Sequence, residues 1–388
     1  MSEPIVDSFF LIFTGAAVLA TLALFSRQSM LVGYILLGTA LGPWGLQVVN
    51  KVETIQAMSH VGVVFLLFLL GLNLHPQKLM RMLRETVTLT VVSTVLFGAI
   101  GFGVAWAFGF GGIEALVIAA GCTFSSTIIG LKLLPTTALH HQHTGEVIIS
   151  ILLLQDLIAI LVLLFLQGMG PEAGIWHELV LLAAALPVLL AVAFLGARYI
   201  LLPLFMRFDT IHEYVFLLAI GWSLGIAELG ALFNLSAEIG AFVAGVALAA
   251  NPISTFIAES LKPLRDFFLV LFFFSIGATF DLTMIPEVVA PALVLAAVLL
   301  LVKPVVFRVL LERGGETGKV PAEVGVRLGQ VSEFALFIAV LAQEVEVISA
   351  RAGYLLQLTT IVTFIASSYY IMLRYPTPIA VTAQLRRD

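Results

Sequence analysis

Residues 145–168, GEVIISILLLQDLIAILVLLFLQG, decide how the rest of the chain is interpreted. The segment is long enough to cross a lipid bilayer as one helix, because about 20 apolar residues suffice. Gln155 and Asp156 stand at its middle, with leucine on both sides. An ionisable side chain at that depth costs at least roughly 2.5–3.5 kcal/mol, and such residues usually mark ion or proton pathways. Asp156 is therefore the candidate site, against the alternative of a carboxylate that only pairs with a neighbouring helix.

The composition of the 388 residues indicates a membrane protein. Hydrophobic residues make up 61% of the chain and charged residues 11%, and the mean hydropathy is +1.11. A water-soluble domain of this length would need more polar surface. An all-α polytopic membrane protein with short loops is therefore expected. The single cysteine, Cys122, excludes an intrachain disulfide and a cysteine-based metal cluster, and no cofactor is expected.

Thirteen apolar segments, separated by proline, glycine or charged residues, are predicted to be transmembrane helices. Lysine and arginine accumulate in cytoplasmic loops. With the N-terminus outside, sixteen of these residues fall on the inner side, and only Lys51 and Arg351 fall on the outer side. The tail, residues 376–388, is then cytoplasmic and too short for a soluble regulatory domain. The predicted helices cover residues 5–25, 28–47, 55–74, 85–108, 112–134, 145–169, 177–205, 212–232, 235–251, 262–282, 286–311, 322–343 and 352–374.

An internal repeat relates the two halves of the chain. GYILLGTAL (33–41) matches GAFVAGVAL (240–248), and FLLGLNL (68–74) resembles FSIGATF (274–280) at nearly the same offset. Chance similarity between glycine-rich apolar helices is the alternative. The offset covers seven predicted helices, and an odd number reverses the direction through the membrane. We therefore expect two inverted six-helix repeats, about 5–169 and 212–374, joined by a linker helix at 177–205 in one transmembrane domain, residues 1–375.

Inverted repeats commonly bind their substrate at the midplane, where helices are broken. The repeat pairs the fifth helix, which carries Ser125, Ser126 and Thr127 between glycines, with the twelfth, which carries GQVSEF (329–334). Hydroxyl and amide groups at that depth can satisfy broken backbone or coordinate a cation. Ordinary hydrogen bonding between helices is the alternative for such a cluster. Helices 5 and 12 are therefore predicted to be interrupted and to cross.

Three further charged residues lie deep in predicted helices. Glu333 could take part in transport, or it could be a structural partner for the broken backbone or for a basic residue. Lys303 and Arg327 are the deep cations available for such pairing. The sequence does not choose between them.

A single buried carboxylate suits exchange chemistry. Burial favours its protonated form and a bound cation favours its charged form, so it holds a proton or a monovalent cation in turn. If the site opens to each side alternately, one proton is exchanged for one cation with no net charge moved. A divalent cation would leave uncompensated charge in a medium of low dielectric constant. The expected cargo at Asp156 is therefore a monovalent cation, with Gln155, Ser125, Ser126 and Thr127 as further binding residues.

Six stretches, taken in order, resemble motifs of the Kef-type branch of the bacterial monovalent cation–proton antiporters. The resemblance covers essentially the whole chain, and Gln155-Asp156 is its most specific element. It implies thirteen helices arranged as a dimerisation domain and a core domain, with crossed, interrupted helices 5 and 12. It also implies a homodimer in the bacterial inner membrane, an elevator-like motion, and exchange of potassium for protons at Asp156. The stretches are GYILLGTALGPWGL (33–46), VVFLLFLLGLNLHP (63–76), FSSTIIG (124–130), LLLQDLIAI (152–160), IGAFVAGVALA (239–249) and GQVSEFALFI (329–338).

Two departures from that family concern its regulation and its twelfth helix. The family's Gly-Gly-Glu-Phe reads Val331-Ser332-Glu333-Phe334 here, which leaves the shape of the break open. The acidic regulatory loop of glutathione-gated members is replaced by TFIAESLKPLR (255–265). Neither glutathione nor nucleotide binding is inferred, and a cytoplasmic regulatory domain or subunit would lie outside this chain.

Other functions remain as alternatives. A sodium–proton antiporter of the same fold differs only in the geometry of the cavity, which motifs do not report. A ligand-gated potassium efflux channel would need a continuous pore, whereas inverted repeats around one midplane acid favour alternating access. A non-transporting sensor is a third reading. An enzyme is the least supported, since GFGG (109–112) lacks a phosphate-loop pattern. Apart from membrane lipid and a second copy of the chain, no partner such as a nucleic acid is expected.

Overall fold

The structure, a computed structural model, describes residues 4–26, 28–49, 52–73, 76–133, 143–167, 175–208, 210–233, 235 and 237–377. Within these ranges the chain forms helices, turns and irregular segments, without a β-strand. Arg27, Lys51, Arg386 and Arg387, which contribute to the predicted orientation, lie outside the described residues, as does the tail from residue 378.

The helices of the first half follow the predicted segments. They are α1 (Pro4–Phe25), α2 (Met30–Leu41), α3 (Val52–Asn73), α4 (Pro76–Ala107), α5 (Gly112–Thr123), α6 (Thr127–Lys132) and α8 (His143–Gln167). The predicted linker helix is observed as α9 (Ile175–Gly196), a π-helical turn η1 (Ala197–Leu201) and α10 (Leu202–Phe208).

The helices of the second half are α11 (His212–Leu232), α12 (Ala237–Ala249), α13 (Ile253–Thr279), α14 (Ile285–Arg313), α15 (Val320–Arg327), α16 (Phe334–Glu344) and α17 (Ala350–Arg374), with a short 3₁₀ turn η2 (Leu282–Met284) before α14. Every predicted transmembrane segment therefore contains a helix, and segments 5 and 12 each contain two. Eight helices of the described part are long and apolar enough to cross a membrane, and four apolar helices are shorter. The shorter ones are α2, α5, α12 and α16. Of these, α2 and α12 occupy corresponding positions of the two repeats, and α5 and α16 belong to the two interrupted segments.

Three predicted boundaries differ from the structure by more than five residues. The fourth segment was expected to begin at residue 85, but α4 begins nine residues earlier, at Pro76. The second segment was expected to run to residue 47, but α2 ends at Leu41, because Pro43 disfavours helical backbone at the residue before it. The tenth segment was expected to begin at residue 262, but α13 begins nine residues earlier, at Ile253. Its first turns carry charged side chains that pair with one another, such as Lys262 with Glu259 at 3.4 Å. Apolar composition marks the part of a helix that faces lipid, not the whole helix.

The contacts between helices divide the chain into two compact units. Unit one consists of Met1–Phe13, Gly38–Arg81 and Gln167–Thr279. Unit two consists of Thr14–Leu37, Met82–Leu166 and Phe280–Asp388, so it contains α4, α5, α6 and α8 together with α14 to α17. The candidate residues of the site all belong to unit two.

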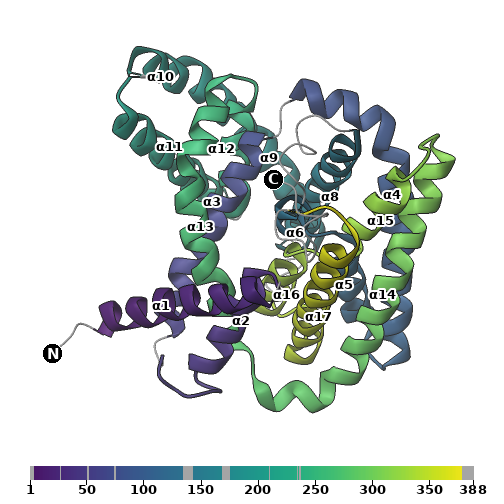
Figure 1. The fold of residues 1–388 in the computed structure, drawn as a ribbon. Coiled ribbons are helices and arrows are strands. Elements are labelled where there is room, and N and C mark those ends of the chain that lie inside the picture. The colour runs from purple at the N-terminus through teal and green to yellow at the C-terminus, as the bar shows by residue number, and fades with distance from the viewer. Residues whose placement is uncertain are drawn as a thin grey trace. The chain divides into compact units, whose positions relative to one another are not determined.

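Packing inside unit one repeats with the same offset as the sequence. Helix α3 packs against both α12 and α13 (Figure 1). Gly38 of α2 lies directly on the backbone of α13, where an added Cβ would meet the carbonyl oxygen of Phe274 and lie 2.8 Å from the nitrogen of Ala278. Gly245 of α12 lies in the same way on α3, against the carbonyl of Phe68 and 2.8 Å from the nitrogen of Leu72. These are corresponding residues of the two halves, which supports the predicted repeat.

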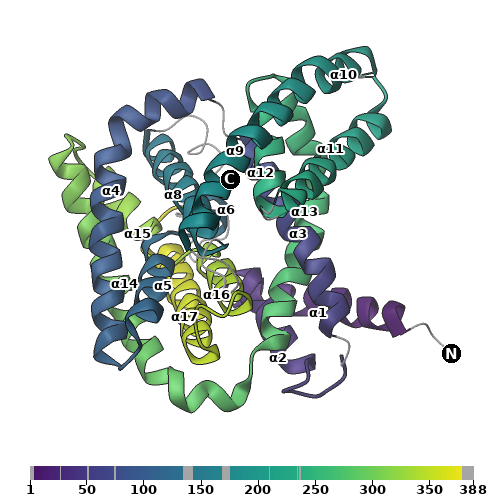
Figure 2. The same cartoon turned by 180° about the vertical axis from the view of Figure 1, so that it is seen from behind.

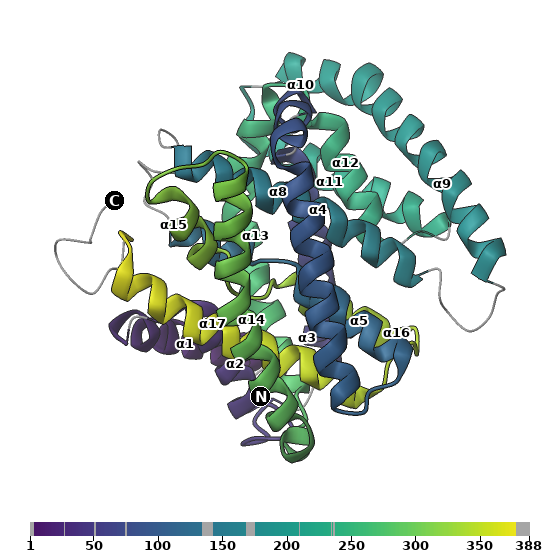
Figure 3. The same cartoon turned by 90° about the vertical axis from the view of Figure 1, so that its right-hand side faces the viewer.

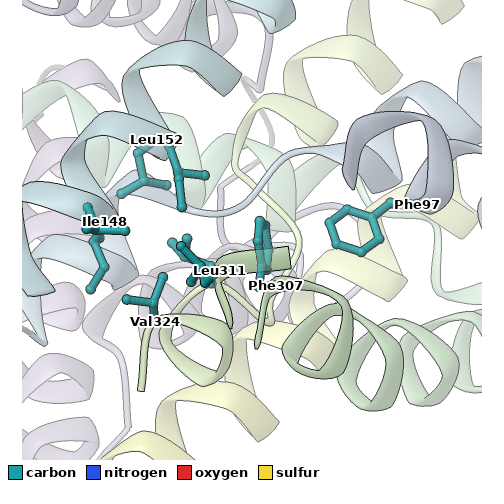
Figure 4. Packing of buried hydrophobic residues seen from close by; sticks show 9 residues of the cluster. Phe97, Ile148, Leu152, Phe307, Leu311 and Val324 are labelled. Atoms are coloured by element: carbon teal, nitrogen blue, oxygen red, sulfur yellow. The ribbon is translucent and has the colours of Figure 1, made fainter. Parts of the chain in front are cut away.

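Unit two is built on an apolar cluster contributed by α4, α8, α14 and α15 (Figure 4). Helices α4 and α14 run beside one another (Figures 2 and 3), and the rings of Phe97 and Phe307 meet edge to face at 5.2 Å. Leu152 of α8 stands one turn before Asp156, and Phe307 stands one turn after Lys303. Because residues four apart share a helix face, this cluster fixes the helices that carry both charged groups.

Candidate ion site

Both predicted interruptions are present. Helix α5 ends at Thr123, Phe124–Ser126 are not helical, and α6 begins at Thr127. Helix α15 ends at Arg327 and α16 begins at Phe334. Val331 and Ser332, which replace the family's glycines, do not prevent the second break. Ser332 instead accepts a hydrogen bond from the backbone nitrogen of Phe334 at 3.2 Å, which gives the first amide of α16 a partner.

The two breaks lie against each other in unit two. The hydroxyl of Ser125 donates a hydrogen bond to the carbonyl oxygen of Leu328 at 2.8 Å. The amide of Gln330 donates to the carbonyl oxygen of Ser126 at 3.4 Å. All four residues are fully buried. Segments about 200 residues apart in sequence therefore meet at their non-helical points, which is the crossing that the sequence predicts.

Side chains of the following helices complete the hydrogen bonding of the broken backbone. The side-chain oxygen of Gln155 on α8 accepts from the backbone nitrogen of Ser125 at 3.0 Å. The hydroxyl of Thr363 on α17 accepts from the backbone nitrogen of Val331 at 3.2 Å. Thr363 was missed by the sequence reasoning, although it is the residue reached by moving Asp156 along the chain by the repeat offset. Ser367, one turn further, donates to the side chain of Gln330 at 3.0 Å and was missed as well.

Asp156 lies beside the first break, with 1% of its surface exposed. The hydroxyl of Thr127, the first residue of α6, donates to its two carboxyl oxygens at 3.3 and 3.2 Å. Glu333, only 3% exposed at the start of α16, is close enough to act on Asp156 electrostatically. The structure thus brings Asp156 and Glu333, the two deep acids of the sequence, into one site. The sequence motifs did not predict that these residues are neighbours.

Lys303 of α14 takes a different partner from those considered in the sequence. Its ammonium group donates to the carbonyl oxygens of Phe124 at 2.7 Å, Gln330 at 3.0 Å and Cys122 at 3.4 Å. It also lies 5.1 Å from the centre of the Phe97 ring. The carboxyl ends of helices carry partial negative charge and unpaired carbonyls. Lys303 therefore joins the broken ends of α5 and α15, and its bonds go to the backbone of both breaks.

Arg327, the last residue of α15, is 1% exposed and ties three segments together. It pairs with Glu323 one turn earlier at 2.9 Å. It donates to the carbonyl oxygen of Leu133 just beyond α6, and to that of Pro376 just beyond α17, at 2.9 and 2.8 Å. Glu323 was not a candidate in the sequence, although an acid four residues before a buried arginine is a signal for such a pair.

The predicted binding residues therefore fall into two groups, one in contact with Asp156 and one in contact with the backbone of the broken helices. Thr127 contacts Asp156, whereas Gln155 and Ser125 hold the broken backbone. The hydroxyl of Ser126 accepts from the backbone nitrogen of Ile129 at 3.1 Å and caps α6. Their roles toward a cation stay predictions. In the part of the chain that the structure describes, no group of three histidine, cysteine or acidic residues could hold a metal ion.

A multi-span helical protein with two crossed, interrupted helices around buried charged groups has the architecture of a secondary transporter. Residues 10–372 match the model of the family described as sodium/hydrogen exchanger, transmembrane. The chain belongs to this family of cation–proton antiporters, as the sequence motifs predicted.

Two proteins with similar sequences are named as transporters. The chain is 28% identical to K(+) efflux antiporter 4 of Arabidopsis thaliana over 353 residues, which cover 88% of this chain and 59% of that protein. It is 26% identical to the iron transporter MagA of Paramagnetospirillum magneticum over 348 residues, which cover 89% of this chain and 80% of that protein. The chain thus spans less than two thirds of the length of the plant relative.

The fold matches a solved antiporter structure over nearly its full length. The sodium proton antiporter MjNhaP1 from Methanocaldococcus jannaschii, determined at pH 8, superposes with a TM-score of 0.69 at 15% sequence identity. The match covers 95% of this chain and 98% of that one. An electron-microscopy structure of the same antiporter gives a TM-score of 0.68. The predicted all-α fold with interrupted helices 5 and 12 is confirmed.

Proposed function

We propose that this chain exchanges a monovalent cation for protons by alternating access, with Asp156 as the group that holds each in turn. The observation that carries the proposal is the position of Asp156, a buried carboxylate beside the crossing of two broken helices, with a neutral hydroxyl on it. A dry carboxylate is stable only when a proton or a cation neutralises it. Because a proton and a cation compete for the carboxylate of Asp156, movement of one across the membrane is coupled to movement of the other.

Exchange of one proton for one cation follows if Asp156 alone titrates during the cycle. Glu333 is the group that could change this stoichiometry, because it is buried and acts on Asp156. Glu333→Gln removes its charge with little change in shape. We expect this variant to keep exchange that is insensitive to membrane potential. A response to membrane potential that is present in wild type and lost in Glu333→Gln would assign a second proton to Glu333.

Potassium is the cation we favour. The support is the sequence resemblance around Gln155-Asp156 and the plant relative that is named a potassium efflux antiporter. The name of the family and of the structural relative point to sodium as the rival. An iron cargo is not favoured, because the described residues contain no group of three metal-ligating side chains.

The remaining expectations concern the assembly. We propose a homodimer in the bacterial inner membrane, with the N-terminus outside and the C-terminus in the cytoplasm. The orientation rests on the distribution of lysine and arginine. Control by a cytoplasmic regulatory domain or subunit is also proposed, and the plant relative is longer than this chain.

The proposal is tested in liposomes that contain a trapped pH dye. Addition of potassium to wild-type protein should move protons, and Asp156→Asn should abolish this movement. Asp266→Asn is the matched control, because Asp266 is half exposed in a surface pair with Arg265. A response to sodium without potassium would keep the mechanism and change the cargo. Undiminished proton movement in Asp156→Asn would overturn the proposal, and a current too large for a carrier would favour the channel.

A further inference from the structure

Helix α3 begins with a polar face that is not covered. Gln56 and His60 stand one turn apart on this face, and both side chains are exposed. The other side of the same turns is buried, and Ser59 there is only 5% exposed. Deeper in the helix, the ring of Phe65 stacks with that of Phe268 on the adjacent helix α13 at 5.7 Å (Figure 1). Packing inside unit one therefore uses one side of the first turns of α3 and leaves the side with Gln56 and His60 exposed.

This polar face lies within the part of α3 that is apolar enough to cross a membrane. The apolar span is Thr54–Leu72, and His60 stands about 9 Å from its start, at 1.5 Å per residue. Ionisable side chains in transmembrane helices are rare, and they almost always face the interior of a bundle or a water-filled cavity. Because His60 is exposed, it does not belong to a packed interior. Water is therefore the surrounding that fits this side chain best.

The exposed polar face ends close below His60. Val61 is still 37% exposed, whereas Val64 and Leu67, one and two turns after His60, are 3% and 2% exposed. Water that reaches Gln56 and His60 is therefore stopped by apolar side chains near the middle of α3. The exposed face opens toward the beginning of the helix.

The internal repeat gives an independent reason to place this face in water. At the offset of 206 residues between FLLGLNL and FSIGATF, Gln56 corresponds to Lys262 and His60 corresponds to Asp266. Lys262 and Asp266 are 53% and 50% exposed on the first turns of α13, each in a surface ion pair. Charged side chains as open as these lie in water, because lipid would not solvate them. Inverted repeats run in opposite directions, so the corresponding face of α3 meets water on the other side of the membrane.

We propose that the face of α3 with Gln56 and His60 lines the aqueous approach by which a hydrated monovalent cation enters from the outer side. The outer side follows from the proposed orientation, in which α3 begins outside, and the passage of a cation rests on the proposed function. The amide of Gln56 and the imidazole of His60 offer polar contacts to a hydrated ion. Neither side chain carries the fixed negative charge that would hold the ion in place. These two residues are therefore assigned to the approach, and Asp156 remains the group that binds the ion.

The first test uses the accessibility of introduced cysteines. The one cysteine of the chain, Cys122, is fully buried, so an introduced cysteine supplies the accessible thiol. Intact spheroplasts that contain the full chain are treated with a membrane-impermeant maleimide. Gln56→Cys and His60→Cys should both be labelled from outside. Ser59→Cys, buried beside His60, should not be labelled. Leu224→Cys should not be labelled either, because this exposed apolar residue stands as far from the outer end of α11 as His60 stands from that of α3.

The labelling has clear contrary outcomes. A His60→Cys protein that is not labelled would overturn the proposal, because its face would then lie against lipid or a second copy of the chain. Labelling only from the cytoplasmic side would overturn the assignment to the outer approach. Equal labelling of Leu224→Cys would also overturn it, since exposure to lipid would then be sufficient for reaction. Labelling requires a folded protein but not exchange, so failure here is distinct from failure of the proposed function.

A second experiment tests whether cations pass this face. In right-side-out vesicles with a trapped pH dye, His60→Glu should lower the external potassium concentration needed for half-maximal exchange, and His60→Lys should raise it. Each change should be about twofold relative to the neutral reference His60→Gln, the effect of one unit charge roughly 9 Å away in water. Choline chloride at high concentration should remove both differences, because salt screens exposed charges. Equal values for the three variants at low salt, or differences that persist at high salt, would overturn the role of His60 in the approach.

Discussion

Thr127 is the residue through which the first break contacts the candidate site. Its hydroxyl reaches both carboxyl oxygens of Asp156, and its backbone begins α6. Thr123 is a useful contrast at the other edge of the same break. Its hydroxyl donates to the carbonyl oxygen of Ala120 at 2.7 Å, within its own helix. Thr127 contacts the carboxylate and Thr123 does not, although both hydroxyls lie at the same break. Comparing variants of the two therefore shows whether an effect comes from contact with Asp156 or from loss of any buried hydroxyl.

Thr127→Val should raise the cation concentration needed for half-maximal exchange about tenfold, the usual effect of losing a hydrogen bond to a charged group. Thr127→Ser should restore the wild-type value, because it keeps the hydroxyl. Thr123→Val should change it little. The measurement is the dependence of dye-reported proton movement on cation concentration. An unchanged half-maximal concentration in Thr127→Val would remove Thr127 from the binding residues.

Lys303 shows how a buried charge can serve structure and site together. Its removal would leave the carbonyl oxygens of Phe124, Gln330 and Cys122 without their donor. Each buried carbonyl left unpaired costs about 1–3 kcal/mol. Lys303→Met should therefore lower the Tm of the protein in detergent markedly, whereas Lys262→Met, at an exposed pair with Glu259, should not. Equal Tm values for the two variants would show that Lys303 is dispensable for the crossing.

At the level of helices, the closest approaches in unit one are made by backbone. Gly38 and Gly245 each place one helix directly on the carbonyl group of another. Gly38→Ala and Gly245→Ala should each destabilise the protein by about 1–3 kcal/mol, the range for overpacking a tight contact. Both should do so to a similar degree, since they occupy corresponding positions of the repeat. Gly225→Ala is the control, because its added Cβ is free. Thermal unfolding in detergent compares the three, and a large difference between the first two would argue against the symmetry.

Helix positions were largely predictable and helix ends were not. Apolar runs located all thirteen segments, because a helix in lipid must be apolar over most of its length. They did not locate the first turns of α4 and α13, whose charged residues carry no such signal, or the early end of α2. The breaks in helices 5 and 12 were predicted from polar residues flanked by glycine and from the repeat. The two-residue change to Val331-Ser332 does not prevent the second break, and Thr363 and Ser332 itself accept hydrogen bonds from its backbone.

Across the molecule, the contacts least visible in the sequence join residues far apart. Asp156 was identified from its own surroundings in the chain, since a carboxylate in an apolar run is conspicuous. The partners of Lys303 and Arg327 were not, because both donate mainly to backbone carbonyls, and a carbonyl group carries no sequence signature. Glu323 could have been found from its spacing to Arg327.

Comparing Arg327 with Arg308 tests how much a buried ion pair contributes to the stability of the whole protein. Each pairs with a glutamate four residues away, Arg327 with Glu323 inside unit two and Arg308 with Glu312 at the surface. Arg327→Met should cost about 3–5 kcal/mol, because it leaves a partly buried carboxylate and two carbonyls unpaired. Arg308→Met should be nearly neutral, as exposed pairs usually are. Unfolding in detergent compares the two variants. Similar stability in both would show that the contacts of Arg327 between α6, α15 and Pro376 are not needed for the stability of the fold.

The pairing of the first break with Lys303 also has a consequence for biosynthesis. The carbonyl groups of Phe124 and Cys122 are made 179 and 181 residues before the lysine that satisfies them. Ribosomes add about 5–20 residues per second, so this interval lasts roughly 10–35 s. Throughout it the nascent α5 and α6 have open carbonyls and are too short to span the bilayer alone. Water or the insertion machinery must hold these groups until the second half of the chain arrives, so the first repeat enters the membrane as an unfinished structure.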